Sequence, residues 1–358
     1  MQVYQKPLSE RADLTGDIVT TGVALIGVGM VSGTYVDALA GLPGLRLTGA
    51  LGARAGSGAA FLARHGLAGR AYRSVAEVAA DPDVGFVVLT TPPNARIDIV
   101  RALVAAGKPV LMEKPVERTL AAAVGICEIC EDAGVPLGIV LQHRASAPAR
   151  SLAARVAEFG ALHVVEISVP WWRDQGYYDT PGRGTYARDG GGVLLTQAIH
   201  VLDLALQFTG PVRDVVALCA TSGFHAMEAE DFVSAGLRFG DGAVGSLVAS
   251  TASYPGRSEE IVLHYAQASV RLQRGLLQID WPGDESETLG ATAASGAGAD
   301  PMAFSSDLHR DVIADFAECL ENGRAPLASG RSALAVHALI EALERSGQSG
   351  TREEVADV

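Results

Sequence analysis

The fold of this chain is decided by the stretch Val23-Ala24-Leu25-Ile26-Gly27-Val28-Gly29-Met30-Val31-Ser32. Its opening apolar run is ended by glycines, which predicts a buried parallel strand. Gly27 and Gly29 allow a tight turn and a close approach of the backbone to a ligand. A helix predicted over 32–42 would then offer free N–H groups and a partial positive charge. We interpret residues 27–31 as a loop for the pyrophosphate of a dinucleotide, although Ser32 replaces the third glycine of the fingerprint.

Strands and helices alternate at short spacing outward from this loop, through residues 21–145. Such alternation predicts βαβ units and a doubly wound parallel sheet, the Rossmann arrangement. Further strands are predicted at 45–51, 84–89, 110–112 and 137–141. Helices are predicted at 58–65, at 74–80 with a Ser74 cap, at 94–106 and at 120–133.

After residue 145 the pattern changes to longer strands without intervening helices, which predicts an antiparallel sheet with one solvent-facing side. These strands are predicted at 162–172, 213–221, 232–239, 243–254, 260–266 and 269–280. Helices are predicted at 193–208, 305–321 and 332–346. Residues 283–303 are rich in Gly, Ala and Ser and are expected to form a mobile surface loop. The chain is thus divided into a tail (1–20), a Rossmann domain (21–145) and a second α/β domain with a large, mostly antiparallel sheet (146–358).

Composition excludes several classes of function. The chain has 358 residues, 48% of them hydrophobic, and a formal net charge of -13. A surface with this balance repels phosphate backbones, so we expect neither a nucleic-acid partner nor a membrane. Residues 1–20 lack the apolar core of a signal peptide, which favours a cytoplasmic location. Cys127 and Cys130 form a C-x-x-C pair, but no second Cys/His pair lies nearby, so we expect two packed thiols and no metal.

The end of the second strand bears on the choice of cofactor. A carboxylate there would bind the ribose 2′-hydroxyl of NAD, but the sequence has Gly52-Ala53-Arg54. A guanidinium suits a 2′-phosphate, so Arg54 favours NADP(H) over NAD(H). The alternative is that Arg54 is a solvated loop charge.

Glu113-Lys114-Pro115 follows a buried strand and therefore lies at the carboxyl edge of the sheet, where ligands bind. Pro115 moves Lys114 away from helical geometry and could allow a cis peptide bond. A lysine at this place would hydrogen-bond a substrate hydroxyl and help to set its pKa. The alternative is a solvated turn.

The apolar helix after Gly190-Gly191-Gly192 carries a polar stripe that consists of Thr196, His200, Asp203 and Gln207. Buried polar groups need partners, and a lone histidine is most simply a satisfied core residue. Because His200 lies one turn from both Thr196 and Asp203, we favour a proton-transfer group that acts as hydride leaves.

Together these motifs resemble the glucose-fructose oxidoreductase, inositol dehydrogenase and rhizopine catabolism (Gfo/Idh/MocA) family. The resemblance runs from Thr21 to about Glu354, through Gly27-Val28-Gly29, Thr91-Pro92-Pro93-Asn94, Glu113-Lys114-Pro115 and the glycine triplet with His200. It implies a Rossmann domain followed by a substrate-binding α/β domain. The large sheet of that second domain commonly makes the dimer or tetramer contact in the family.

The resemblance also implies roles for particular residues. Lys114 and His200 match the catalytic lysine and histidine, and Thr196 stands where many members have Asp, so it could orient substrate but not act as a base. Arg96 stands where His is common. The implied cofactor contacts are Gly27, Val28, Gly29, Met30, Val31, Arg54, Thr90, Thr91, Pro92, Asn94, Glu113, Lys114, Gln142, Trp172 and Arg173. The implied substrate contacts are Lys114, Tyr178, Arg183, Tyr186, Thr196 and His200. A rigid loop packed by its own aromatic side chains is the alternative for the segment from Trp171 to Tyr186.

The sequence therefore predicts an NAD(P)-dependent oxidoreductase. It would move hydride between nicotinamide and a carbinol carbon of a sugar, sugar acid or inositol-like polyol, in a homodimer or homotetramer. Two alternatives remain open, an NAD-dependent glycoside hydrolase of the same fold and a non-catalytic cofactor-sensing regulator. The direction of the reaction and the exact substrate are also open.

Overall fold

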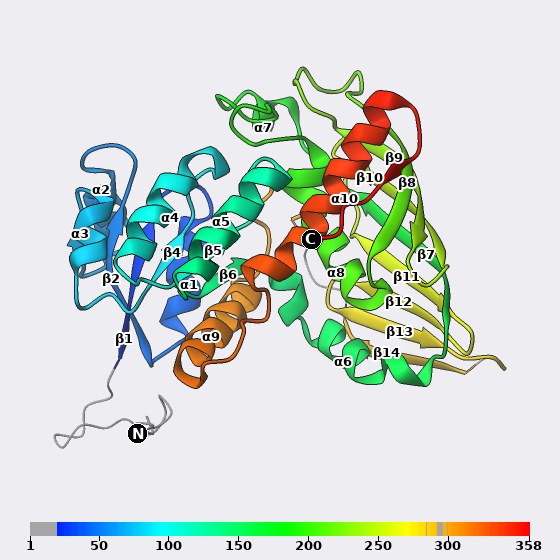
Figure 1. The fold of residues 1–358 in the computed structure, drawn as a ribbon, viewed down its shortest axis with the longest axis horizontal. Coiled ribbons are helices and arrows are strands. Elements are labelled where there is room, and N and C mark those ends of the chain that lie inside the picture. The colour runs from blue at the N-terminus through cyan, green and yellow to red at the C-terminus, as the bar shows by residue number, and fades with distance from the viewer. Residues whose placement is uncertain (1–19, 284, 292–295, 299) are drawn as a thin grey trace. The chain divides into compact units, whose positions relative to one another are not determined.

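A computed structural model describes residues 20–283, 285–291, 296–298 and 300–358, so the predicted tail lies outside the described residues except for Thr20. The chain forms two compact units (Figure 1). Unit 1 contains the residues up to Val116 together with Val124–Gln142 and Ser306–Gly330. Unit 2 contains Glu117–Ala123, His143–Ser305 and Arg331–Val358.

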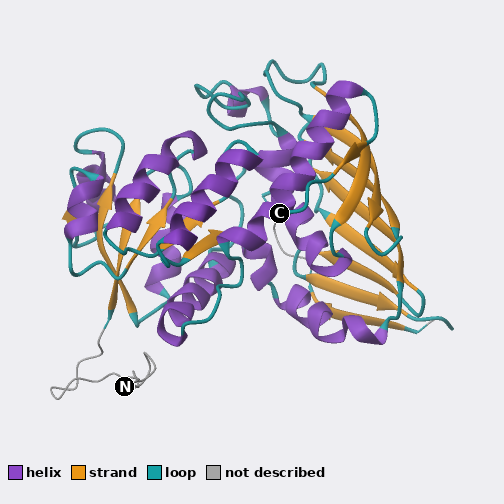
Figure 2. Cartoon of the chain, in the orientation of Figure 1, coloured by secondary structure: helices purple, strands orange, loops and turns teal. Residues whose placement is uncertain are grey.

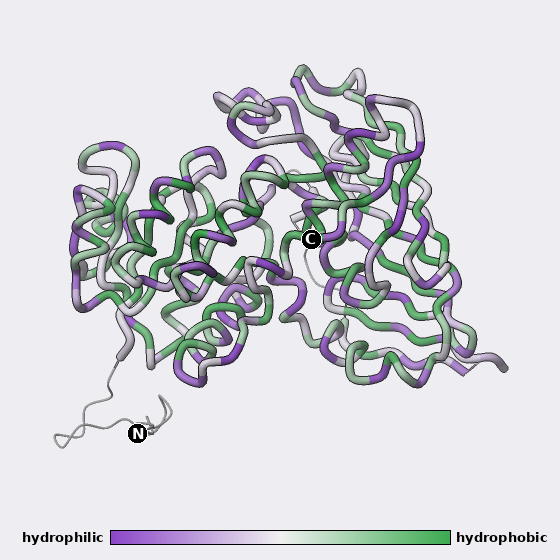
Figure 3. Tube along the Cα trace, in the orientation of Figure 1, coloured by the Kyte–Doolittle hydropathy of each residue, from purple (hydrophilic) through white to green (hydrophobic). Residues whose placement is uncertain are grey.

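The core of unit 1 is a six-stranded parallel sheet in the order β3-β2-β1-β4-β5-β6, which confirms the doubly wound prediction. The inner strands consist almost entirely of buried apolar residues because helices cover both faces of such a sheet (Figure 3). The strands are β1 (Thr21–Ile26), β2 (Leu45–Leu51), β3 (Arg70–Ala71), β4 (Phe86–Leu89), β5 (Val110–Glu113) and β6 (Leu137–Val140). The two-residue β3 was not predicted, since it is too short to give a pattern.

The helices of unit 1 follow the predictions closely. Ser74 caps α3 by accepting a hydrogen bond from the Glu77 N–H at 3.2 Å, as predicted. The helices are α1 (Ser32–Ala40), α2 (Ser57–Arg64), α3 (Val75–Ala80), α4 (Arg96–Ala105), α5 (Leu120–Asp132) and α9 (Asp307–Asn322). α9 is distant in sequence but packs against α1 and β6, which places it in unit 1 rather than with the strands that precede it.

Unit 2 is built on a nine-stranded sheet in the order β14-β13-β12-β11-β7-β10-β9-β8-β15. Only β7 and β10 pair in parallel, so the prediction of a mostly antiparallel sheet is confirmed. The strands are β7 (Leu162–Pro170), β8 (Val212–Ala220), β9 (Phe232–Phe239), β10 (Val244–Ser250), β11 (Glu260–Tyr265), β12 (Ser269–Gln273), β13 (Leu276–Asp280), β14 (Ser286–Gly290) and β15 (Glu353–Glu354).

Two predictions for unit 2 were wrong. The single strand predicted over 269–280 is a hairpin, because Gly275 turns the chain with φ +79°. The loop predicted over 283–303 contains β14, which pairs with β13, and Ala297 is only 6% exposed. The prediction for residues 284, 292–295 and 299 lies outside the described residues.

Helices cover one face of the large sheet, and no described helix covers the other (Figure 2). The helices of unit 2 are α6 (Ala147–Arg155), α7 (Gln175–Tyr178), α8 (Ile199–Thr209) and α10 (Gly330–Ser349). α6 and α7 were not predicted. Among the described helices, none is long and apolar enough to cross a membrane.

Candidate active site

The turn between β1 and α1 has the geometry of a dinucleotide-binding loop. Gly27 adopts φ +104°, and a Cβ there would lie 2.8 Å from the carbonyl carbon of Thr90. Position 27 therefore requires glycine. At Gly29 a Cβ would meet no atom within 4 Å, so the backbone there borders open space. The remaining loop residues are Val28, Met30 and Val31.

The first turn of α1 directly follows this loop; its Ser32 and Thr34 N–H groups donate to the carbonyl oxygens of Gly29 and Val31, at 3.3 and 3.0 Å. Val31 caps the helix without a side-chain hydrogen bond, and the turn contains no acidic residue. The Ser32 hydroxyl donates to the Gly29 carbonyl oxygen at 2.6 Å, so this serine fits tightly where the fingerprint has glycine. A helix end with partial positive charge and no internal counter-charge suits a pyrophosphate.

Arg54 lies just after β2 in an exposed turn. The Ser57 hydroxyl donates to the Arg54 carbonyl oxygen at 2.5 Å, where α2 begins. This is the end of the second strand, where the ribose of a dinucleotide would lie.

The loop after β4 is tied to the loop after β1. The Thr90 hydroxyl donates to the Gly27 carbonyl oxygen at 2.7 Å. The Thr91 hydroxyl is buried and has no hydrogen-bond partner among the described residues. Pro92 and Asn94 follow and are exposed. Because an unpaired buried hydroxyl is costly, Thr91 fits a loop that is completed by a ligand.

Arg96 joins this loop to the segment that carries Lys114. Arg96 is only 2% exposed. Its Nε donates to the Thr91 carbonyl oxygen at 3.0 Å, and its guanidinium also donates to the carbonyl oxygens of Glu113 and Pro115. The sequence showed Arg96 only as a departure from the common histidine, whereas the structure gives it a central place in the site.

Lys114 lies at the carboxyl end of β5, and the Lys114–Pro115 peptide bond is cis. The Glu113 carboxylate accepts hydrogen bonds from the Lys114 backbone N–H at 3.1 Å and from the Tyr35 hydroxyl at 2.8 Å. His309 Nε2 lies 3.9 Å from the same carboxylate. Burial, and then Glu113, raises the pKa of Tyr35 well above its usual range, so Tyr35 remains a donor. These contacts let Glu113 hold the backbone of Lys114 in place. The cofactor contact predicted for Glu113 stays a prediction.

Gln142 follows β6 at the same edge of the sheet. It is 8% exposed, and its Oε1 is buried without a hydrogen-bond partner among the described residues. Like Thr91, it keeps an unused polar atom where the strands end, which is the expected place for a ligand.

In unit 2, Glu230 holds the glycine triplet at the start of the predicted catalytic helix. Its carboxylate accepts hydrogen bonds from the N–H groups of Gly192 and Leu194, each at 3.1 Å. A Cβ on Gly192 would lie 1.8 Å from the Glu230 carbonyl oxygen, so that position requires glycine. The triplet therefore lets two segments of chain approach closely.

A second carboxylate lies against this triplet. A Cβ on Gly191 would lie 2.9 Å from Glu344 Oε1, which has no hydrogen-bond partner among the described residues. Burial, and then the charge of Glu230, raises the pKa of Glu344 to about 8.

The helix predicted over 193–208 begins as a π-helical turn, Leu194–Ala198, and continues as α8. The Thr196 hydroxyl donates to the Gly192 carbonyl oxygen at 2.6 Å. His200 is 7% exposed and lies at the start of the α-helical part. π-Turns of this kind often occur at functional sites.

Asp203, a member of the predicted polar stripe, has a structural partner. Its carboxylate accepts two hydrogen bonds from Arg144, from Nε at 2.8 Å and from NH2 at 2.5 Å. Desolvation raises the pKa of Asp203, and Arg144 opposes that shift. The ring of His143, next to Arg144, lies against the His200 ring with centroids 5.1 Å apart and a tilt of 32° between the planes. Neither His143 nor Arg144 was assigned a role from the sequence, although both follow a strand end, as Lys114 does.

The aromatic segment after β7 is well packed. Arg173 is 3% exposed, and NH1 donates to the carbonyl oxygens of Trp172 and Gly298, each at 2.7 Å. Burial lowers the pKa of Arg173. The Arg183 guanidinium lies 4.2 Å from the centre of the Tyr177 ring.

Two predicted substrate residues of this segment differ in exposure. The Tyr178 hydroxyl is buried against Thr251 Oγ1 at 2.7 Å, and burial raises its pKa. Tyr186 is 42% exposed, and desolvation, followed by the charge of Glu230, raises its pKa to about 12. Their substrate contacts stay predictions, and Tyr186 is the more accessible.

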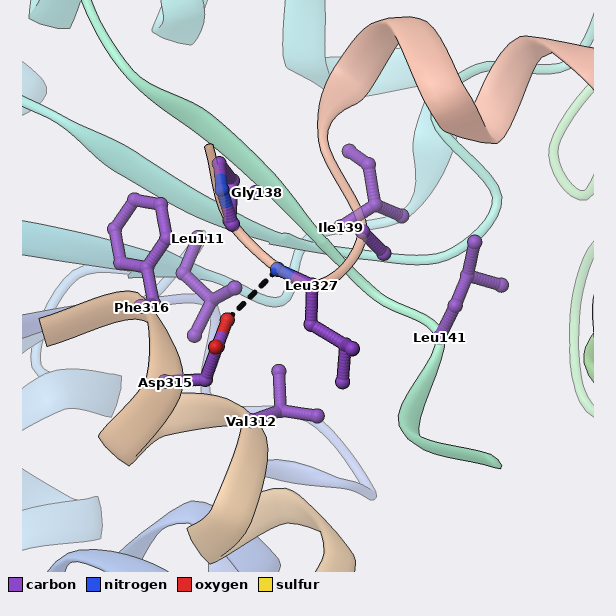
Figure 4. Close-up of a pocket in the computed structure, with 10 residues that line it drawn as sticks. Leu111, Gly138, Ile139, Leu141, Val312, Asp315, Phe316 and Leu327 are labelled. Carbon is purple, nitrogen blue, oxygen red and sulfur yellow. Dashed lines mark hydrogen bonds between the residues drawn. The ribbon is translucent and has the colours of Figure 1, made fainter. Parts of the chain in front are cut away.

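A gap between α9 and the sheet of unit 1 is no ligand site (Figure 4). It measures about 210 Å³ with open solvent included and holds no space that a water molecule could occupy. Asp315 and Leu327 both line this gap, and the Asp315 carboxylate accepts a hydrogen bond from the Leu327 N–H at 2.8 Å. Cys127 and Cys130 are buried in the core, each 1% exposed, as predicted.

The fold and the dinucleotide loop define an NAD(P)-dependent oxidoreductase. Residues 21–140 match the oxidoreductase family with an NAD-binding Rossmann fold, and residues 151–271 match the GFO/IDH/MocA C-terminal domain. The chain belongs to the Gfo/Idh/MocA family.

Several similar proteins are named as dehydrogenases or reductases of sugars or inositols. The chain is 28% identical over 353 residues to D-apiose dehydrogenase of Paraburkholderia graminis, across 93% of this chain and 89% of the relative. It is 29% identical over 234 residues to 1,5-anhydro-D-fructose reductase of Ensifer adhaerens, across 62% of this chain and 66% of that enzyme. The solved WlbA dehydrogenase of Bordetella pertussis, in complex with NADH and UDP-GlcNAcA, has a TM-score of 0.80 at 26% identity, across 95% of this chain and 99% of that one.

Proposed function

We propose that this chain is a dehydrogenase or reductase of CH–OH groups that acts on a sugar, a sugar acid or an inositol-like polyol. The observation that carries the proposal is the position of Lys114 at the strand edge, where Arg96 bonds to its segment and to the cofactor loop. The sugar substrates in the names of the relatives support this substrate class.

The residues of unit 1 fit a nicotinamide dinucleotide, which when bound would accept or donate the hydride. The open space at Gly29 admits the pyrophosphate, and Thr91 and Gln142 retain buried polar atoms for hydrogen bonds. Exposed Arg54 and the missing carboxylate after β2 support NADP(H) over NAD(H). We therefore propose NADP(H) as the preferred form.

In the proposed reaction, His200 accepts the proton of the substrate hydroxyl and Lys114 stabilises the developing alkoxide. The reverse direction uses the same groups with His200 as the acid. Thr196 orients the substrate, since a hydroxyl bonded to a backbone carbonyl has no basic character of its own. Arg183 and Tyr186 are the proposed contacts to the remaining hydroxyls or to a carboxylate.

Domain roles follow from the same proposal. Residues 21–145 bind the cofactor, and residues 146–358 bind substrate and form the assembly. The uncovered face of the large sheet supports a homodimer or homotetramer, because several apolar side chains are exposed there. These are Val164, Val216, Leu218, Val244 and Val248.

The test is the absorbance of reduced nicotinamide with purified protein. NAD and NADP are assayed separately against inositols, aldoses, uronates, a UDP-linked uronate and glycosides. A rise with a polyol or sugar, stronger with NADP, is expected. Release of aglycone without net reduction would instead identify the glycoside hydrolase. Cofactor binding without any turnover, unaffected by changes at Lys114 and His200, would identify the regulator.

A further inference from the structure

His143 and His200 form a buried pair of imidazoles in unit 2. Their ring centroids lie 5.1 Å apart with an angle of 32° between the planes, and each residue is 7% exposed. They come from different elements, since His143 follows β6 and His200 lies on α8. Two titratable rings in such contact cannot gain protons independently.

The pair is fixed by a neighbouring ion pair. Arg144 binds both carboxylate oxygens of Asp203, one turn beyond His200, with side chains that are 4% and 2% exposed. Arg144 NH1 also donates to the Ser332 hydroxyl at 3.1 Å. Arg144 is the neighbour of His143 in sequence, and Asp203 lies one turn beyond His200. The ion pair between them therefore fixes the position of His143 relative to the His200 ring.

Arg144 and Asp203 are the charged groups that the contacts above place beside the pair. On α8 the nearest acid is Asp203, whose charge Arg144 already balances. The strands that pack on α8, β7 and β11, bury apolar side chains, among them Ile167 and Leu263. Under the proposed mechanism Lys114 would add a positive charge near the substrate hydroxyl, equally in all variants considered below.

We propose that His143 is a positioning residue for His200: it holds the catalytic ring in place and takes up the proton that would otherwise inactivate it as the pH falls. The proposal rests on the proposed function in the assignment of His200 as the base. When the pair binds one proton, that proton resides on His143 in some of the molecules. In those molecules His200 stays neutral. A second proton is opposed by the first, since two positive charges about 5 Å apart repel strongly at a low effective dielectric constant.

The test compares wild type with His143→Phe, which keeps an aromatic ring but cannot be protonated. The acid limb of kcat/KM should move to higher pH by roughly half to one unit, because His200 then takes the first proton alone. Turnover at pH 8 to 9 should fall less than turnover at pH 6. His143→Ala, which removes the ring as well, should lower kcat at every pH through loss of positioning. His163→Phe, at an exposed position at the start of β7, is the matched control with an unchanged profile.

Titration of the His200 ring by NMR, in full-length protein with labelled histidine and without substrate, separates this proposal from the proposed function. A higher His200 midpoint in His143→Phe supports the coupling even if no sugar is turned over. An unchanged midpoint, or an acid limb that stays in place while the variant remains folded, would overturn it.

Discussion

Arg96 illustrates how a single buried side chain organises the site. It bonds to the carbonyl oxygens of Thr91, Glu113 and Pro115, so it connects the predicted cofactor loop with the segment of the predicted catalytic lysine. Its residue type was visible in the sequence, but its partners lie up to 20 positions away along the chain. Only the fold could reveal that they converge.

Replacement of Arg96 by alanine should damage both stability and function. Several buried carbonyl oxygens would lose their donor, so we expect a loss of about 3 kcal/mol or more in the free energy of unfolding. Reduced-nicotinamide fluorescence should show weaker cofactor binding, and kcat should fall as Lys114 loses its fixed backbone. Arg101→Ala, on the same helix with a side chain that is 59% exposed, is the matched control. Equal behaviour of the two variants would contradict the role given to Arg96.

At the scale of single elements, Gly27 and Gly29 of the first loop are expected to serve different purposes, backbone geometry at Gly27 and ligand space at Gly29. Gly27→Ala should lower stability by about 1–3 kcal/mol, because φ +104° disfavours a Cβ that would also meet Thr90. Gly29→Ala should leave the melting temperature unchanged and weaken cofactor binding, since the new methyl group fills open space. Thermal melts and fluorescence titrations of both variants check the pair. Loss of stability in Gly29→Ala would show that this space is needed for packing instead.

Glu344, which lies against the glycine triplet before α8, is expected to make the free energy of unfolding depend on pH. Burial raises the pKa of Glu344 from 4.5 to about 8. Below about 4.5 the side chain is protonated in both states and has no effect. As the pH rises from there to about 8, the unfolded chain loses the proton while the folded chain keeps it, so stability falls.

Glu344→Gln should therefore raise the melting temperature relative to wild type at pH 8.5, and the gain should vanish near pH 4.5. Glu128→Gln, at an exposed position on α5, is the matched control and should give no pH-dependent gain. A difference in melting temperature between Glu344→Gln and wild type that stays constant across this pH range would contradict a raised pKa for Glu344.

Elements with a strong pattern were predictable, and elements that depend on tertiary contacts were not. The apolar runs of β1, β4 and β5 and the Ser74 cap gave correct positions because local chemistry determines them. The hairpin at Gly275 and the helix α6 were missed, although Ser146 caps α6 by accepting a hydrogen bond from the Ala149 N–H at 3.3 Å, much as Ser74 caps α3. The roles of Lys114 and His200, inferred from a strand end, helix spacing and the family resemblance, stay predictions, whereas His143 acquires its neighbour only through folding.

For the whole molecule, the uncovered face of the nine-stranded sheet predicts self-association. By strand register its exposed valines and Leu218 share one face of the sheet, opposite the face of the buried Ile167 and Leu247. Leu218→Asp and Val248→Asp together should shift the mass measured by light scattering toward the monomer, because charge on an apolar interface is costly. Ala154→Asp, exposed on α6, should leave the mass unchanged. A monomeric wild-type protein would contradict the proposed assembly.

The cytoplasmic location stays a prediction.

The proposed reaction depends most directly on Lys114. The measurement is a comparison of Lys114→Ala with wild type, using fluorescence titration of the reduced cofactor and turnover of the best substrate from the absorbance panel. We expect cofactor affinity to be largely retained, since Lys114 is one implied contact among many and the pyrophosphate loop and Thr91 are untouched, with turnover lowered by about 10²–10⁴-fold. Near-normal turnover in Lys114→Ala would contradict the assignment of the catalytic lysine and with it the proposed mechanism.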